Sequence, residues 1–293
     1  KPLPAAHDVL SPGLTGADLL DCRAADLGDA STMAETEKGS DVGKPTDYRP
    51  LSCMACTEGA GLDFEFSMAF QPIVDSRTGQ VFSQEALVRG LNNEPASEVL
   101  ARVNDDNRYR FDQACRVKAI KLAADLGIST FLNVNFMPNA VYRPELCIRT
   151  ALEAAQTFGF PIDRIIFEIT EGERVSDLAH LRSIVTDYQQ RGFQVAIDDF
   201  GAGYAGLNLL ADLRTDFVKL DMGLIRQIDQ DKTRRIICRG IVQVCRELDI
   251  EVVAEGIETR DELRCLEDLG VYLFQGYHFA RPSFESLASV NFA

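Results

Sequence analysis

The sequence has no run of apolar residues long enough to span a bilayer, and its first residues lack the apolar centre of a secretory signal. It also has no excess of basic residues, because 45 Asp and Glu outnumber 30 Lys and Arg and give a net charge of -15. These absences argue against membrane contact within this chain and against duplex nucleic acid as a partner. A phosphorylated small molecule stays possible, since bound metal ions reverse the local charge.

Two further absences concern single residue types. The chain begins without Met, so we expect it to be a fragment of a longer protein. Its 8 Cys show no framework spacing, and the last five fall in helix-like segments. This pattern is typical of reduced thiols, and we therefore expect a cytoplasmic protein.

Residues 1–63 differ in composition from the rest and show no sustained helix or strand periodicity. We interpret them as an N-terminal extension or linker that is partly disordered. Its one sharp motif is Cys53 and Cys56, with Cys22 and His7 upstream. A zinc site would use such residues, but the spacing matches no common zinc finger closely and favours ordinary thiols. A partner-docking arm is a further interpretation of this acidic segment.

From residue 64 to 293 the sequence alternates between strand-like and helix-like segments. Short apolar runs predict strands at 66–74, 81–89, 130–135, 164–170, 194–199, 216–221, 250–255 and 271–275. Helical spacing predicts helices at 95–104, 109–126, 145–158, 176–190, 205–213, 223–248 and 259–269. Repeated strand–helix units with short loops imply parallel strands with right-handed crossovers. This count suits a (β/α) barrel, and a doubly wound open sheet is the alternative.

Polar side chains recur where the predicted strands end. The positions are Glu85, Asn135, Glu168, Asp198, Lys219, Glu255 and Gln275. In a (β/α) barrel these ends converge on one face, the usual face for catalysis. Polar groups that merely meet water at strand ends would be a mixture of Ser, Lys, Thr and Asn. Here they are mostly Glu and Asp with a single lysine, which indicates a built site.

The candidate ligands are all hard oxygen donors, which suit Mg²⁺ or Mn²⁺ better than Zn²⁺. Clustered carboxylates repel one another unless cations lie between them, and enough oxygens are present for two ions that share a carboxylate. Asp198 and Asp199 are adjacent, and neighbouring side chains of a regular strand point to opposite faces. We therefore expect both to serve one site only because the strand ends there. The predicted chemistry is phosphoryl transfer or phosphodiester hydrolysis.

Glu85-Ala86-Leu87 is the signature of the EAL family of cyclic di-GMP phosphodiesterases, and the chain resembles this family from about residue 64 to residue 282. Its other motifs, in family order, are Phe70-Gln-Pro72, Glu85-Ala-Leu-Val-Arg89, Asn135, Glu168-Ile-Thr-Glu171, Asp198-Asp-Phe-Gly201, Lys219-Leu-Asp221, Ala254-Glu-Gly256 and Gln275-Gly-Tyr277. The resemblance implies an α/β fold for residues 64–293, a modified (β/α)8 TIM-like barrel with one antiparallel strand.

The resemblance also implies a role for each matching residue. The metal ligands would be Glu85, Asn135, Glu168, Asp198, Asp199 and Glu255, with Asp198 shared by two ions. The catalytic residues would be Lys219 and Gln275, which place the attacking water, together with Glu255. The substrate would meet Gln71, Pro72, Leu87, Arg89, Asp221, Gly276 and Pro282. Glu171 would hold the loop at residues 201–204 in its working shape.

The implied activity is hydrolysis of cyclic di-GMP to linear 5′-pGpG with two Mg²⁺ or Mn²⁺ ions, whereas Ca²⁺ is expected to bind and inhibit. The alternative is a catalytically weak relative that acts as a cyclic di-GMP receptor or signalling scaffold. Such relatives usually lack a ligand or the lysine, and this chain has them all. We also expect a homodimer whose contact includes residues 204–213. Two departures from the family pattern, Gly90 and Phe136-Met137, concern details of the substrate pocket.

Overall fold

The computed structural model describes residues 62–141, 143–170, 178–203 and 206–292. Cys53, Cys56 and Glu171 lie outside these ranges, as does almost all of the predicted extension, so what the sequence suggests for them stays a prediction. The described strands are β1 (Ser67–Asp75), β2 (Gln80–Arg89), β3 (Phe131–Phe136), β4 (Ile165–Thr170), β5 (Gln194–Phe200), β6 (Phe217–Leu220), β7 (Glu251–Ala254), β8 (Leu273–Phe274) and β9 (Ser283–Phe284).

Eight of these strands close into a barrel. They follow one another in the order β2-β3-β4-β5-β6-β7-β8-β1, and β1 pairs again with β2. Strands β2 to β8 run parallel, whereas β1 is antiparallel to both of its barrel neighbours and also pairs with β9. The predicted modified (β/α)8 barrel is therefore confirmed, with β1 as the antiparallel strand, and the open-sheet alternative is wrong.

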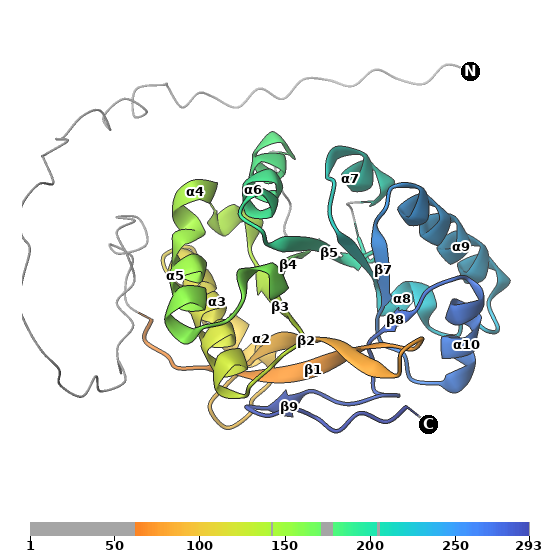
Figure 1. Ribbon diagram of the computed structural model, residues 1–293, viewed down its shortest axis with the longest axis horizontal. Helices are drawn as coiled ribbons and strands as arrows, with labels where there is room; N and C mark the ends of the chain where they lie inside the picture. Colours follow the sequence, from red (N-terminus) through yellow and green to blue (C-terminus); the bar gives the residue numbers. More distant parts are fainter. Residues whose placement is uncertain (1–61, 142, 171–177, 204–205, 293) are drawn as a thin grey trace, which may run out of the picture. The chain divides into compact units, whose positions relative to one another are not determined.

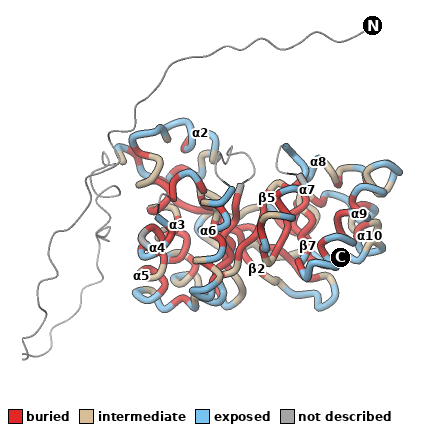
Figure 2. Tube along the Cα trace, turned by 90° about the horizontal axis from the view of Figure 1, so that it is seen from above, coloured by how far each residue is buried: buried red, intermediate tan, exposed pale blue. Residues whose placement is uncertain are grey.

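Helices cover the outside of the barrel (Figure 1), and the burial pattern changes from buried strands at the centre to exposed outer helix faces (Figure 2). Parallel neighbours need such crossovers, because a hairpin cannot join them. The α-helices are α2 (Ala96–Leu100), α3 (Arg108–Asp125), α4 (Pro144–Cys147), α5 (Arg149–Phe158), α6 (Leu178–Gln190), α7 (Gly206–Asp212), α8 (Met222–Ile225), α9 (Lys232–Glu247) and α10 (Arg260–Asp268). The described residues also form two 3₁₀ turns, η1 (Pro138–Ala140) and η2 (Ile162–Arg164).

Two predicted helices are divided, and the helix expected over residues 145–158 is α4 followed by α5, with Ile148 between them. The single helix expected over residues 223–248 is instead α8 followed by α9. Gln227 has a φ of 57°, which a helix cannot continue through, and the Asp231 carboxylate accepts hydrogen bonds from the backbone nitrogens of Thr233 (2.8 Å) and Arg234 (3.1 Å). An aspartate in this position starts a new helix, because it satisfies the free N–H groups of the first turn.

The core has two parts, as strand alternation requires. A large cluster lies between the strands and the surrounding helices. A small separate cluster consists of Ile73, Ile166, Ala196, Phe217, Val253 and Leu273, all buried. Each member is two positions before or after a polar residue of the predicted site, on the same strand or directly after it, so both side chains face the barrel interior. These apolar side chains form a layer that fills the barrel beneath the polar one.

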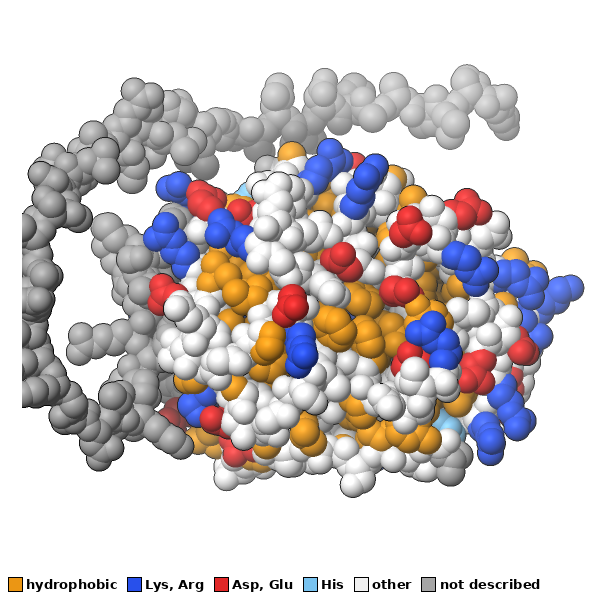
Figure 3. Space-filling model, viewed as in Figure 1, with side chains coloured by type: hydrophobic (Ala, Val, Ile, Leu, Met, Phe, Trp, Pro, Cys, Tyr) orange, Lys and Arg blue, Asp and Glu red, His pale blue; other side chains and the backbone are white. Residues whose placement is uncertain are grey.

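The surface has an uneven charge distribution despite the acidic composition. Lys and Arg gather over α9 and α10, at the right-hand edge of the face shown in Figure 3. Helix α9 also exposes the apolar side chains of Ile236, Ile237 and Val244, and Leu248 directly after the helix is exposed as well. Among the described helices, none combines the length and the apolar character that crossing a membrane would need.

Candidate active site

The polar residues singled out in the sequence come together at one end of the barrel. Asn135, Glu168, Asp198 and Lys219 lie near the carboxyl ends of β3 to β6, and Glu255 and Gln275 directly follow β7 and β8. Glu85 differs from expectation, because it lies in the middle of β2 rather than at its end. Strand β2 continues to Arg89 since its antiparallel pairing with β1 extends to Ser67.

Lys219 is the centre of the site. Its Nζ atom lies 3.2 Å from Glu85 Oε2, 2.8 Å from Glu168 Oε1, 2.9 Å from Asp198 Oδ1 and 2.7 Å from Glu255 Oε1. The lysine is 1% exposed. A single lysine therefore lies among four carboxylates and cannot neutralise them all, which leaves an excess of negative charge in a buried place.

Amide side chains fix the carboxylates on the β2–β4 side. Asn135 Nδ2 donates to Glu85 Oε1 (3.1 Å) and to Glu168 Oε2 (3.2 Å), and Gln275 Nε2 donates to Glu85 Oε2 (2.8 Å). Asn133, which sequence reasoning missed, donates through Nδ2 to Glu168 Oε1 at 2.8 Å. Its position two residues before Asn135 puts both amides on one face of β3, and this spacing could have revealed it.

Asp198 and Asp199 both reach the site because β5 contains a bulge. Ile197 pairs with Val218 and Phe200 with Leu220, so two aspartates lie opposite the single residue Lys219. Asp199 has a φ of 54°, the left-handed region that Asp tolerates better than most residues. The sequence-based explanation was wrong in this respect: the strand does not end at the aspartates but continues to Phe200.

The carboxylates form two overlapping groups. Glu85, Glu168 and Asp198 each offer an oxygen within 4.8 Å of the others, and so do Asp198, Asp199 and Glu255. Asp198 belongs to both groups. This arrangement can hold two cations side by side with one shared carboxylate.

The electrostatics of the cluster favour cation or proton uptake. Burial raises the pKa of Glu168 well above its usual range, and the charges of Glu85 and Asp198 add to this effect while Lys219 opposes it. Burial likewise raises the pKa of Glu255 well above normal, and burial together with Asp198 and Asp221 raises that of Asp199 to about 6. Glu85 is the exception, because Lys219, Gln275 and Asn135 outweigh its burial and lower its pKa.

A cavity of about 230 Å³ opens beside the acidic cluster. Its lining includes Gln71, Asp221 and Gly276, three of the predicted substrate residues, next to Asp199 and Glu255. It also includes Met222, Glu258 and Tyr277, which were not predicted as site residues. Tyr277 ends the motif that begins at Gln275, whereas no motif indicated Met222 or Glu258. Gln71 is held in place there, since its Nε2 donates to the carbonyl of Ala280 (3.1 Å) and its Oε1 accepts from Gln275 Nε2 (3.3 Å).

The other predicted substrate residues do not line this cavity. Leu87 borders an apolar cavity of about 270 Å³ between α2, α3 and the ends of β2 and β3. Pro72 is buried in β1, and Pro282 directly precedes β9. Arg89 ends β2, and its Nη1 donates to the carbonyl of Val88 at 2.7 Å. Their predicted roles remain predictions.

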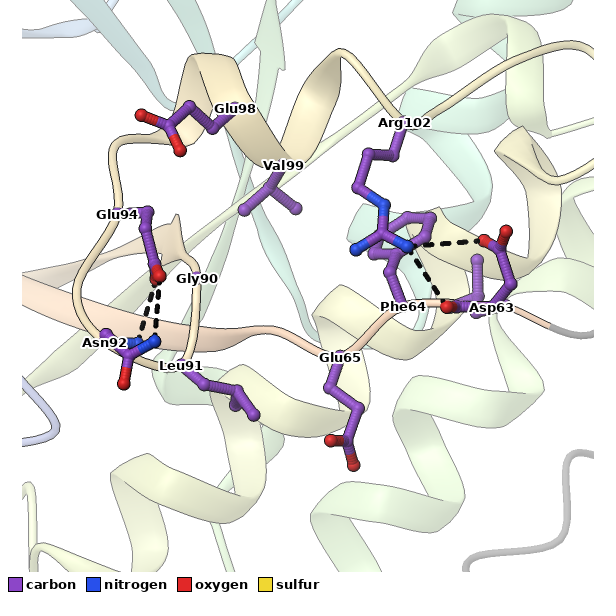
Figure 4. Close-up of a pocket in the computed structure, with 11 residues that line it drawn as sticks. Asp63, Phe64, Glu65, Gly90, Leu91, Asn92, Glu94, Glu98, Val99 and Arg102 are labelled. Carbon is purple, nitrogen blue, oxygen red and sulfur yellow. Dashed lines mark hydrogen bonds and ion pairs between the residues drawn. The ribbon is translucent and has the colours of Figure 1, made fainter.

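Gly90 borders a third and larger cavity, of about 630 Å³ (Figure 4). In Figure 4 the Glu94 carboxylate points to Asn92, whose backbone N and Nδ2 donate to it at 2.8 and 2.9 Å. A Cβ atom on residue 90 would lie 2.2 Å from Glu94 Oε2. A larger residue at position 90 would therefore require the Glu94 side chain to move aside.

Comparisons with known proteins give a consistent result. The family described as EAL domain matches residues 60–282. The chain is 58% identical to a structure described as a standalone versatile EAL protein from Vibrio cholerae O395 in its c-di-GMP-bound form, with a TM-score of 0.77 over 79% of this chain and 98% of that one. It is 32% identical to Klebsiella pneumoniae BlrP1 in a manganese and cyclic di-GMP complex, with a TM-score of 0.73 over 79% of this chain and 60% of that one.

Curated relatives include the blue light- and temperature-regulated antirepressor BluF of Escherichia coli, 29% identical over 76% of this chain and 55% of BluF. Another is the cyclic di-GMP phosphodiesterase PA2567 of Pseudomonas aeruginosa, 26% identical over 77% of this chain and 40% of that protein. The chain spans about half, or less, of the length of these relatives.

Proposed function

This chain belongs to the EAL domain family, and on that premise we propose that it hydrolyses cyclic di-GMP to linear 5′-pGpG with two divalent cations, Mg²⁺ or Mn²⁺. The observation that carries the proposal is the pair of carboxylate groups that share Asp198 at the catalytic end of the barrel. The names of its relatives support it as well, since BlrP1 was solved with manganese and cyclic di-GMP and PA2567 is named a cyclic di-GMP phosphodiesterase.

The donor set fits two hard cations. Glu85, Asn135, Glu168 and Asp198 would hold one, and Asp198, Asp199 and Glu255 the other. When bound, such ions lower the pKa of a water molecule and neutralise the charge that develops on phosphate oxygens. Asn135 directs Nδ2 at Glu85 and Glu168, so ligation by its oxygen requires the amide to turn over.

The remaining residues of the site place the water and the substrate. Lys219 would hold the attacking water through a hydrogen bond from Nζ, and its buried charge would keep the surrounding carboxylates together. The nitrogen of Gln275 is used by Glu85 and Gln71, while its buried Oε1 has no hydrogen-bond partner among the described residues. This oxygen is therefore available as an acceptor for the water. Asp221, Gly276 and Gln71 would contact the substrate from the adjoining cavity.

The direct test is incubation of the protein with cyclic di-GMP and Mg²⁺, Mn²⁺ or Ca²⁺, with chromatographic separation of the products. We expect 5′-pGpG with Mg²⁺ and Mn²⁺ and none with Ca²⁺, because the larger, looser shell of Ca²⁺ does not suit two close ions. Tight binding of cyclic di-GMP without product in any metal would instead support the receptor alternative. That outcome would suit a regulatory protein, and the relative BluF is named an antirepressor.

Lys219→Met separates binding from chemistry. The proposed role predicts that turnover falls by about 100-fold or more while Mn²⁺ still binds, because the ligand oxygens remain in place. Glu168→Gln is the matched variant and should impair both Mn²⁺ binding and turnover. A Lys219→Met protein that turns over at nearly the wild-type rate would remove the lysine from the mechanism.

We also propose that the chain forms a homodimer through α7 and the neighbouring apolar face of α9. Leu207 on α7 is 59% exposed, and the exposed apolar residues of the α9 region are Ile236, Ile237, Val244 and, directly after the helix, Leu248. Apolar side chains gathered in this way are typical of a protein–protein contact. Sedimentation of the wild type and of Leu207→Asp tests the idea. A monomer at all concentrations in the wild type would contradict it.

A further inference from the structure

Arg116 of α3 is fully buried between the helix layer and the barrel, away from the carboxylate cluster. Its side chain is 0% exposed, and its Cζ atom lies 5.1 Å from the ring centre of Phe136, 5.3 Å from that of Phe167 and 5.9 Å from that of Tyr188. The three rings also pack against one another, with centroids 5.1–5.9 Å apart. The guanidinium is thus enclosed by an aromatic cage, an attractive environment for a desolvated cation.

Polar contacts connect the caged guanidinium to α6 and, through Asp112 of its own helix, to the residue that follows β3. Arg116 Nη1 donates to the Tyr188 hydroxyl of α6 at 2.8 Å, and Nη2 lies 2.6 Å from Asp112 Oδ2 as an ion pair. The other oxygen of Asp112 accepts from the backbone nitrogen of Met137 at 2.9 Å. Met137 directly follows β3 and is two residues from Asn135, so the ion pair holds the end of that strand.

Stability alone does not explain a charge in this place. A buried ion pair is weak evidence for stability, because apolar residues of similar volume often serve as well or better. The Nε atom of Arg116 also has no hydrogen-bond partner within the described part of the chain, which adds a desolvation cost. Burial by itself would lower the pKa of Arg116, yet the charge of Asp112 and the Tyr188 hydroxyl raise it, so the group stays charged.

The position of the cage on the two strands suggests what the charge does. Phe136 is the residue after Asn135, and Phe167 is the residue before Glu168. Because neighbouring side chains of a strand point to opposite faces, the rings lie on the outside of the barrel directly behind these two inward side chains. Asn135 and Glu168 are paired in register across β3 and β4. Asp199 and Glu255, by contrast, lie on β5 and after β7, and the cage contains no residue of those strands.

We propose that Arg116 is a positioning residue, which fixes Asn135 and Glu168 from behind so that the first cation group keeps its geometry. The proposal rests on the proposed function only in that these two side chains are taken as cation ligands. Loss of Arg116 should therefore lower the Mn²⁺ affinity of the group formed by Glu85, Asn135, Glu168 and Asp198. The Mn²⁺ affinity of the group that contains Asp199 and Glu255 should stay almost unchanged.

The test is calorimetric titration of the protein with Mn²⁺ in the absence of substrate, resolving the two binding events. Arg116→Met keeps the side-chain length but removes the charge and the forked donors. The variant Glu85→Gln identifies the first group, because it should abolish one of the two binding events. We expect Arg116→Met to lower the Mn²⁺ affinity of that event by about tenfold, the lower end of what outer partners of metal ligands contribute. The Mn²⁺ affinity of the other event should fall by less than about twofold. Arg116→Lys retains the cation in the cage and should recover part of the loss. Tyr188→Phe, which keeps the ring and removes one hydrogen bond, should have a smaller effect.

Val242→Ala is the control for general destabilisation. Val242 is buried on α9, which packs against α8 and β7 and lies across the barrel from β3 and β4 (Figure 1). Its truncation leaves a cavity in that part of the core. Equal weakening of both binding events in Arg116→Met, as in Val242→Ala, would show a merely structural role and overturn the proposal. Unchanged Mn²⁺ binding in a folded Arg116→Met protein would also overturn it, and if Arg116→Met does not fold, the same criteria apply to Arg116→Lys and Tyr188→Phe. Failure of the proposed function appears separately, as wild-type protein that binds Mn²⁺ but yields no 5′-pGpG.

Discussion

At the scale of single residues, Asp199 meets two requirements at once. Its positive φ lets β5 bulge, so that it shares one side of the strand with Asp198, and its carboxylate completes the second carboxylate group, to which we assign a cation. Backbone conformations of this kind cost free energy and collect at functional sites. Asparagine and aspartate tolerate the left-handed region better than other residues with side chains. The backbone conformation alone therefore limits which residue types suit position 199.

Two substitutions separate these requirements. Asp199→Asn should fold with nearly wild-type stability in EDTA but bind the second Mn²⁺ much more weakly, because the left-handed backbone is kept and the charge is lost. Asp199→Val should lose metal binding and also about 1–3 kcal/mol of unfolding free energy, since a β-branched side chain is strained at this φ. Urea unfolding in EDTA together with Mn²⁺ titration measures both effects. Equal stability of the two variants would contradict the strain argument.

The same residue predicts how metal binding depends on pH. The metal-free pKa of Asp199 is about 6, above the ordinary value of about 3.9. Its protonated form therefore stabilises the fold; this contribution is complete below about pH 4 and is lost as the pH rises through about 6. A cation needs the ionised form, so Mn²⁺ affinity at the second group should fall up to about tenfold per pH unit below pH 6, with a proton released on binding. Calorimetry at several pH values checks this, and an equally steep fall in Asp199→Asn would assign the effect to another group.

At the scale of elements, the site depends on how closely the segments after β7 and β8 approach each other. The backbone nitrogen of Ile257 donates to the carbonyl of Gln275 at 3.0 Å, and that of His278 to the carbonyl of Ile257 at 3.0 Å. A Cβ atom on Gly276 would lie 2.1 Å from the oxygen of Ile257, which is backbone and cannot turn aside. Glycine at this position therefore allows the segments that carry Glu255 and Gln275 to approach closely at the same end of the barrel.

Gly276→Ala should force these two segments apart. We expect a loss of about 1–3 kcal/mol of unfolding free energy, as for other overpacked positions, and a marked fall in turnover because Gln275 moves. Gly240→Ala is the matched control: this glycine lies in the exposed part of α9, and a Cβ atom there would meet no other atom within 4 Å, so alanine should stabilise by about 0.5–1 kcal/mol. A Gly276→Ala protein as stable and active as Gly240→Ala would show that the contact is not needed.

The sequence allowed the strands to be predicted better than the helices or the details of the site. Each barrel strand is a short apolar run, a local signal, and all eight appear close to their predicted positions. The division between α8 and α9 was missed because Asp231 lies inside an otherwise helical pattern and its capping role depends on its backbone conformation. Asn133 was missed because it lies within β3 rather than at its end, and the bulge at Asp199 because it arises from pairing with β6, which is not encoded locally.

At the scale of the whole molecule, the barrel is built around unbalanced negative charge. The pKa values of Glu168, Asp198, Asp199 and Glu255 are all raised, first by burial, and only Lys219 lies among them as a cation within the described part of the chain. The fold that brings these carboxylates together is therefore destabilised by their mutual repulsion at neutral pH. Bound cations would relieve this repulsion.

Metal removal should consequently lower thermal stability. At a free Mn²⁺ concentration of 100 times the dissociation constant, one bound ion contributes about 2.7 kcal/mol. For a domain of this size that corresponds to a rise in Tm of about 5–10 °C over the protein in EDTA. Differential scanning fluorimetry measures the shift, and the double variant Glu168→Gln with Asp199→Asn is the control that should show little of it. An equal shift in that variant would place the stabilising ion elsewhere.

The antiparallel β1 has a consequence for how the protein is made. Among the described strands it is the first to leave the ribosome, yet its pairing with β8 completes the ring, and Gln71 within it donates to the carbonyl of Ala280, 209 positions later. During most of translation the edge of β1 that pairs with β8 is therefore unpaired. An unpaired strand edge can associate with other chains. A nascent polypeptide arrested before residue 273 would possess neither a sealed ring nor Gln275. We expect such truncated chains to be bound by chaperones or degraded by proteases, so that no partly active protein accumulates.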